Sequence, residues 1–215
     1  MSMETIRAEQ LPELFAGAAR VFDDKKDELC EMDARMGDGD LGLTMQKGFG
    51  ALPDLLRDNQ EPQDAGKTLM KAGMKMAGVV PSTMGTLMAS GIMEGGKALK
   101  AKAEITPADL AGFLEGFAAG IQKRGKCEPG DRTILDAMQP AAEAARREAE
   151  AGGSLPAVLD AAVSGAGEGV EATKTMVPKF GKAAVHAAKA AGVPDQGAVA
   201  GKYLLEGLRE AAGSL

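Results

Sequence analysis

Apolar residues recur along most of the chain at the three- and four-residue spacing that places them on one face of an α-helix. The clearest example follows Thr106-Pro107-Ala108-Asp109, a capping box with proline at the first helical position. The apolar stripe after this box consists of Leu110, Phe113, Leu114, Phe117, Ala118 and Ile121. Gly125 interrupts the pattern, so we expect a helix that ends there.

Similar start and stop signals divide the rest of the chain. They predict helices over residues 6–36, 43–56, 63–79 and 82–102, and further helices capped by Asp131, Ser154 and Asp195. Residues 177–192 are ambiguous, and Gly165 and Gly169 allow a neighbouring helix to approach closely. About eight helices with short connections indicate antiparallel neighbours in a bundle or a closed ring.

Composition supports this class, because alanine, leucine, methionine and glycine dominate while β-branched residues are sparse. The length of 215 residues predicts one all-α domain over residues 1–215. A net charge of −6 and 3% aromatic residues argue against a nucleic-acid partner. We also expect no membrane span and no cleavable signal, and Cys30 and Cys127 are expected to be reduced thiols of a cytoplasmic protein.

Residues 33–42 carry the densest chemistry, with three carboxylates, Asp33, Asp38 and Asp40, interleaved with glycines. Glycine permits the tight turn that would bring these side chains together, and converging carboxylates repel one another unless a cation lies between them. Carboxylate oxygens that leave coordination positions open suit Mg²⁺, which shares its coordination with waters and phosphates. The segment predicts a magnesium–phosphate site, with a solvated acidic turn as the alternative.

Three familiar motifs fail here. Residues 37–42 fit the dinucleotide pattern G-x-G-x-x-G, but a charged, helix-like segment precedes them where a strand is required. Residues 91–98 approach a P-loop but lack its closing Ser or Thr. An EF-hand fails because Phe49 stands at the position of the bidentate glutamate.

Three other segments add polar or charged groups. Ser82 and Thr83 offer hydroxyls at a helix N-terminus, which is an anion site or simply a cap. Residues 125–136 form a loop in which Arg132 is by default a solvated charge, and residues 172–182 carry Lys182, by default a surface side chain.

In this order and spacing, the four segments resemble the nucleotide-binding L subunit of dihydroxyacetone kinase, the DhaL-type (Dak2-like) domain, over essentially the whole chain. The shared hallmarks are Asp33-x4-Asp38-x-Asp40-x-Gly42, the Ser82–Gly85 turn, Pro129-Gly130-Asp131-Arg132-Thr133-x-Leu135-Asp136, Glu171–Lys174 and Asp195–Ala198. The resemblance implies an antiparallel eight-helix barrel with the nucleotide in one mouth. It also implies that Asp33, Asp38 and Asp40 are the catalytic metal ligands and hold two Mg²⁺ that bridge the phosphates of ADP or ATP.

Further contacts carry over position by position. The resemblance implies phosphate contacts at Leu41, Gly42, Leu43, Thr44, Ser82, Thr83 and Met84. It implies adenine and ribose contacts at Gly125, Ile134, Lys182, Asp195, Gln196 and Gly197. Two Mg²⁺ (+4) against three aspartates (−3) leave a charge of +1, so an acidic protein can still hold a polyphosphate.

The chain departs from the family pattern at four contact positions. Leu41, Thr44, Met84 and Lys182 stand where the family usually has His, Asn, Ser and Arg. Leu41 and Met84 remove polar phosphate contacts, and lysine lacks the bidentate fork of arginine. All three metal-ligand positions are intact, which favours retained phosphoryl chemistry.

We therefore expect a dihydroxyacetone (glycerone) kinase-type phosphotransferase subunit. Phosphoryl would pass from a magnesium-bound adenine nucleotide to the terminal hydroxyl of a short ketose held by a separate K-type subunit. The only histidine, His186, lies outside the motifs and is expected to be an ordinary helix or lid residue. A regulatory module without turnover, favoured by Leu41 and Lys182, and a kinase subunit for a four-carbon ketose are the alternatives. A phosphotransferase-system phosphocarrier as donor and a homodimer also stay open.

Overall fold

The computed structural model describes residues 5–185 and 187–215, and it confirms the predicted all-α class. His186 lies outside the described residues. The helices are α1 (Leu11–Asp24), α2 (Lys26–Ala34), α3 (Leu41–Asp58), α4 (Ala65–Val79), α5 (Thr83–Ala98), α6 (Pro107–Gly125), α7 (Leu135–Glu150), α8 (Leu155–Ala172), α9 (Gly181–Val185), α10 (Ala187–Ala190) and α11 (Gln196–Ala212). Two strands, β1 (Ile6–Arg7) and β2 (Glu104–Ile105), and two 3-10 turns, η1 (Ala8–Gln10) and η2 (Thr173–Thr175), complete the fold.

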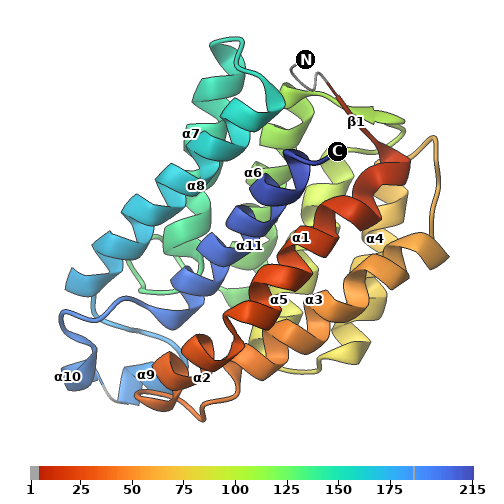
Figure 1. Ribbon diagram of the computed structural model, residues 1–215. Helices are drawn as coiled ribbons and strands as arrows, with labels where there is room; N and C mark the ends of the chain where they lie inside the picture. The colour runs from red at the N-terminus through yellow and green to blue at the C-terminus, as the bar shows by residue number, and fades with distance from the viewer. Residues whose placement is uncertain (1–4, 186) are drawn as a thin grey trace.

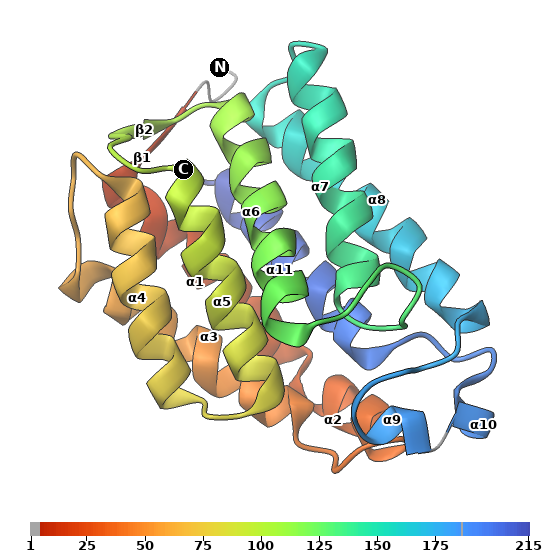
Figure 2. The same cartoon turned by 180° about the vertical axis from the view of Figure 1, so that it is seen from behind.

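The long helices form a closed ring. Each packs on the next in the order α1, α3, α4, α5, α6, α7, α8 and α11, and α11 returns to α1. The interior is filled by apolar side chains, of which Phe15, Phe22, Phe49 and Phe117 are the largest fully buried ones. Figures 1 and 2 show the short helices α2, α9 and α10 at one end of this ring, and β1, β2 and the C-terminus at the other.

The predicted first helix, residues 6–36, is wrong because the chain breaks twice in this range. The backbone leaves the helical conformation at Lys25 (φ −96°, ψ 4°), which divides α1 from α2 within a highly charged stretch. The α2 helix then packs on α3 and α11, where the Tyr203 hydroxyl donates to Glu28 Oε1 at 2.5 Å. This turn of direction brings Asp33, near the end of α2, to the end of the ring.

A small antiparallel pair, β1 with β2, replaces the predicted start of the first helix. Ile6 pairs with Ile105 and Arg7 with Glu104, and the Ala8 N–H donates to the Ala103 carbonyl at 2.8 Å. Pairing across about a hundred residues leaves no periodic signal in so short a segment, and so the local pattern missed it.

The predicted cap of α7 is also wrong. This helix begins at Leu135, and Asp131 instead accepts the Glu128 N–H at 2.8 Å within the preceding loop. Asp136 accepts the N–H groups of Gly130 at 2.5 Å and Thr133 at 2.7 Å. Hydrogen bonds from the loop backbone to these two aspartate side chains therefore hold the loop in its conformation.

Glycines set the closest helix contacts, as predicted for Gly165 and Gly169. A Cβ added at Gly165 would lie 2.5 Å from the Pro140 carbonyl oxygen, and one at Gly207 would lie 2.5 Å from the Ala18 Cα. Only glycine permits this approach of α8 to α7 and of α11 to α1. Across the described residues, every helix is too short or too polar to cross a bilayer.

Candidate functional site

The acidic loop between α2 and α3, residues 35–40, is folded by the carboxylate of Asp33. Its Oδ2 accepts the N–H groups of Gly39 at 2.9 Å and Asp40 at 3.2 Å. Gly39 has φ +77°, and a Cβ at Gly37 would collide with the Asp33 carboxylate. Glycine is thus strongly favoured at both positions, and the loop closes around one buried aspartate.

The three predicted metal ligands come together in this loop. One carboxylate oxygen each from Asp33, Asp38 and Asp40 lies within 4.8 Å of the other two. Asp40 occupies the N-cap position of α3, yet its side chain makes no cap hydrogen bond in the described structure. An all-oxygen set with open coordination positions fits a hard cation such as Mg²⁺.

Three helix N-termini, those of α3, α5 and α11, point at the same end of the ring. The Ser82 hydroxyl caps α5 by accepting the Gly85 N–H at 3.0 Å, and Asp195 caps α11 by accepting the Ala198 N–H at 2.9 Å. Other N–H groups in the first turns have no intrahelical partner, and the helix dipoles place positive potential there. This arrangement suits a polyanion next to the acidic loop.

A cavity of about 530 Å³ opens between these elements. The predicted residues that line it are Asp33, Asp38, Asp40, Leu41, Thr44, Ser82, Thr83, Met84, Ile134, Lys182, Asp195, Gln196 and Gly197. Helices far apart in the sequence thus deliver most of the predicted contact residues to one place.

Three predicted contact residues do not line the cavity. Gly42 packs against the Lys26 carbonyl, and the side chain of Leu43 is exposed to solvent. Gly125 lies behind the cavity wall, next to Leu87 and Cys127, where burial raises the pKa of the cysteine thiol. These residues shape the elements around the site.

Sequence reasoning missed several residues of the cavity wall: Gly37, Pro81, Leu87, Arg132, Thr133, Phe180, Gly181 and Ala183. Arg132 is the largest departure, because its side chain is buried instead of solvated. It also has φ +60°, in the left-handed region that non-glycine residues rarely adopt. Neither the charge of Arg132 nor the spacing of the residues around it indicated this backbone conformation.

The segment containing α9 and α10, residues 174–194, lies against the acidic loop. Lys182 Nζ lies 2.5 Å from Asp38 Oδ2, and this hydrogen bond lowers the pKa of Asp38. Met36 packs with Ala183, Ala190 and Val193 in a small apolar cluster separate from the main core. Both partners of the ion pair are more than half exposed, so its stabilisation is small and falls with salt.

Asp195 is buried beneath this segment. Burial raises the pKa of its carboxyl to about 6, although the Ala198 N–H and the Arg132 guanidinium, 3.6 Å away, act in the opposite direction. The side chain thus combines a cap, an ion pair and a costly buried charge.

A helical ring that directs three N-termini and three carboxylates into one cavity defines an all-α protein with a candidate site for a hard cation and an anion. The DAK2 domain family matches over residues 35–210, and the chain belongs to this family.

Curated relatives agree with this membership. The chain is 30% identical to the Escherichia coli K12 "PEP-dependent dihydroxyacetone kinase, ADP-binding subunit DhaL", over 89% of this chain and 91% of that protein. It is 31% identical to the human "Triokinase/FMN cyclase" over 86% of this chain, but it spans only 32% of that protein.

Solved structures of the dihydroxyacetone kinase of C. freundii share the fold. The native form gives a TM-score of 0.72 at 24% identity, covering 94% of this chain and 34% of that chain. A second structure, in complex with AMP-PNP and Mg²⁺, gives 0.70 at 24% identity, covering 98% and 35%. The resemblance stated from the sequence motifs is therefore confirmed at the level of family and fold.

Lys182→Gln is expected to raise the affinity of the chain for Mn²⁺ about two- to fivefold, the range that an exposed ion pair supplies. The ammonium group holds Asp38 and competes with any cation for that carboxylate. Titration of free Mn²⁺ by electron paramagnetic resonance measures the change.

Lys189→Gln is the matched control for this experiment, because it removes the same charge from an exposed position of the same segment. Its side chain takes no part in the ion pair between Lys182 and Asp38. An equal gain in both variants would contradict direct competition at Asp38.

Asp195→Asn is expected to flatten the pH dependence of stability. Burial raises the folded pKa of Asp195 above the ordinary aspartate value of 3.8, so its contribution to stability is complete well below pH 3.8 and is lost as pH rises through about 6. The stability of the parent relative to the variant should therefore fall by about 2 kcal/mol between pH 4 and pH 7. Urea unfolding at several pH values measures this difference.

Asp64→Asn provides the same cap chemistry at a partly exposed position, where Asp64 accepts the Lys67 N–H at 2.8 Å. If both variants show the same pH dependence, burial of Asp195 is not the cause.

Proposed function

We propose that this chain is a phosphotransferase subunit that binds ADP or ATP with Mg²⁺ and serves phosphoryl transfer to a short ketose such as dihydroxyacetone. The observation that carries the proposal is the acidic loop, where oxygens of Asp33, Asp38 and Asp40 lie within 4.8 Å of one another beside the cavity. The names of the relatives support it, since they include an ADP-binding subunit of a dihydroxyacetone kinase and a complex with AMP-PNP and Mg²⁺.

The chain's own residues would position the nucleotide in three ways. Asp33, Asp38 and Asp40 would hold two Mg²⁺, whose positive charge stabilises the transferred phosphoryl group. The first turns of α3 and α5, with the hydroxyl of Thr83, would orient the phosphate oxygens. The cavity wall around Ile134 and Gly197 would receive the nucleoside.

A separate K-type subunit would bring the ketose. The cavity features described above account for a metal–nucleotide complex, and a triose has few atoms with which to bind, so it needs a dedicated site to orient its hydroxyl. Exposed apolar side chains stand on elements beside the cavity, namely Leu43, Val177 and Phe180. Such groups suit a face that a partner covers.

A regulatory module that binds nucleotide without turnover is the second candidate. It is favoured by Leu41, which lines the cavity with an apolar side chain, and by Lys182, which is engaged with Asp38. The phosphoryl donor, either free ATP or a phosphocarrier that recharges bound ADP, separates two versions of the first candidate.

Nucleotide binding is expected to require a divalent cation. Three carboxylates repel the phosphates unless Mg²⁺ lies between them, so calorimetry should detect ADP binding with Mg²⁺ and lose it in EDTA. Asp40→Asn should abolish this binding with helicity unchanged in circular dichroism, because the carboxylate lies outside the helix hydrogen-bond pattern.

Asp58→Asn, at the opposite end of α3, is the control and should bind as the parent does. Equal affinity in EDTA would exclude the metal-bridged site. A large loss of helicity in the Asp40 variant would make that residue structural.

Phosphorylation of dihydroxyacetone is expected only when a cognate K-type subunit is present. A coupled assay for triose phosphate, run with ATP or a phosphocarrier and with or without that subunit, measures this requirement. Robust turnover by the chain alone would place the ketose site here. Magnesium-dependent nucleotide binding with no turnover under any of these conditions would favour the regulatory module.

A further inference from the structure

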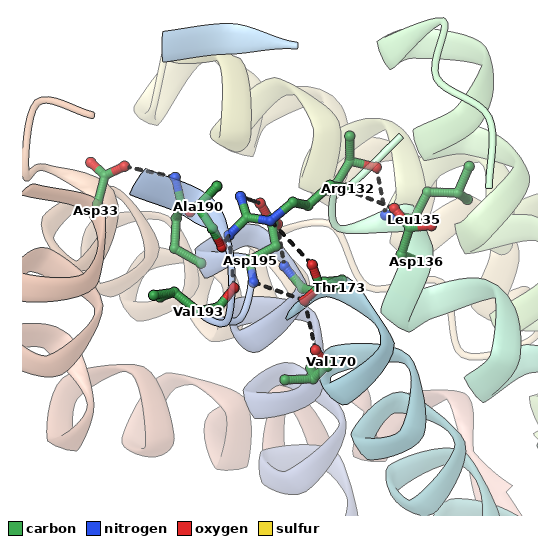
Figure 3. A network of polar contacts seen from close by, with 12 residues as sticks. Asp33, Arg132, Leu135, Asp136, Val170, Thr173, Ala190, Val193 and Asp195 are labelled. Atoms are coloured by element: carbon green, nitrogen blue, oxygen red, sulfur yellow. Dashed lines mark hydrogen bonds and ion pairs between the residues drawn. The ribbon is translucent and has the colours of Figure 1, made fainter. Parts of the chain in front are cut away.

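Arg132 joins the two ends of the 174–194 segment. Its Nε donates to the Thr173 carbonyl at 3.2 Å, just before the segment. Its Nη2 donates to the carbonyls of Val193 at 2.9 Å and Ala190 at 3.4 Å, at the other end (Figure 3). The side chain is fully buried, and so these carbonyls replace water around its charge.

Other hydrogen bonds also hold the two ends of the segment together; we call these joined ends the base of the segment. The Asp195 N–H donates to the Thr173 hydroxyl at 2.9 Å, and the Gly192 N–H donates to the Lys174 carbonyl at 2.9 Å. Arg132 itself keeps φ +60°, a conformation that costs a non-glycine residue energy and persists only where its surroundings enforce it. At this base, hydrogen bonds connect the loop before α7, the end of α8 and the start of α11.

The closed base sets where the rest of the segment starts and ends. The Lys179 N–H adds a second tether, since it donates to the Asp131 carbonyl at 3.2 Å and the two side chains form an ion pair. The segment leaves at Thr173 and returns at Val193, and between these points it touches the acidic loop through Lys182 and the Met36 cluster. If the two ends of the segment separate, neither contact is held in position. Lysine at position 132 would keep the charge, but its ammonium group could not donate to these separate carbonyls as the planar guanidinium group of arginine does.

We propose that Arg132 is a positioning residue: by closing the base of this segment it presents Lys182 to Asp38, where the ammonium competes with a cation. Position 132 then influences metal affinity without touching a metal ligand. Because coupling between sites is reciprocal, a cation at Asp38 also weakens the hold of the segment on the acidic loop. The inference rests on the proposed metal site but not on phosphoryl transfer.

Hydrogen exchange of the chain without nucleotide tests the closed base. Arg132→Met should speed exchange several-fold over residues 174–194 and leave the long helices of the ring near the parent rate. Arg132→Lys should restore part of the protection. Arg146→Met is the matched control, because it removes an arginine that pairs with Glu115 on the ring surface, and its exchange over residues 174–194 should equal that of the parent.

Titration with Mn²⁺ tests the coupling to Lys182. Arg132→Met should raise Mn²⁺ affinity about two- to fivefold, as Lys182→Gln does, and the double variant should gain nothing further. Arg146→Met should leave the affinity unchanged. A residue that only stabilises the fold would lower Mn²⁺ affinity, or would change it additively with Lys182→Gln.

The outcomes separate this inference from the proposed function. Uniformly faster exchange, or additive gains in Mn²⁺ affinity, would overturn the positioning role. If Arg132→Met does not fold, Arg132→Lys provides the same two readouts, and parent-like values in both would overturn the role as well. If the parent chain binds no Mn²⁺, both the metal site and the competition fail, while hydrogen exchange still decides whether Arg132 closes the base.

Discussion

The site depends on the carboxylate of Asp33 accepting the N–H groups of Gly39 and Asp40. This contact folds the acidic loop tightly enough to bring Asp38 and Asp40 beside a third negative charge. The arrangement is unfavourable by itself, because like charges in a small volume repel one another. The helix N-termini and Lys182 oppose that repulsion with positive potential, so the anionic loop and its cationic surroundings depend on each other.

The ring provides the rigid frame for this balance. Helices separated by much of the sequence end beside one cavity because each packs on its neighbours at a fixed distance, in places with backbone against backbone. The 174–194 segment differs, since it rests on a small apolar cluster, the ion pairs of the exposed Lys179 and Lys182, and the buried Arg132. The rigid ring of helices thus carries one weakly held segment, residues 174–194, beside the carboxylates of the acidic loop.

Local signals were sufficient wherever a residue acts on its own helix. Ser154, Asp195 and the Thr106 capping box start α8, α11 and α6 as predicted, since a cap and its N–H partners lie within three residues. The break at Lys25 and the pairing of β1 with β2 were missed because they depend on partners distant in the sequence. The same holds for the site. The aspartates were found from their spacing. The burial of Arg132 was missed, because its side chain donates hydrogen bonds to carbonyls about forty and sixty residues away.

The order of helices around the ring also has a kinetic consequence. Every neighbouring pair of long helices is also consecutive among the long helices of the sequence, except α1 with α11. Most of the ring can therefore assemble from local contacts, which favours rapid folding, whereas the last seam must close a loop of nearly the whole chain. That seam is where Gly207 meets Ala18 with no room for a side chain. The slowest ordering event is thus expected to be also one with a strict steric requirement.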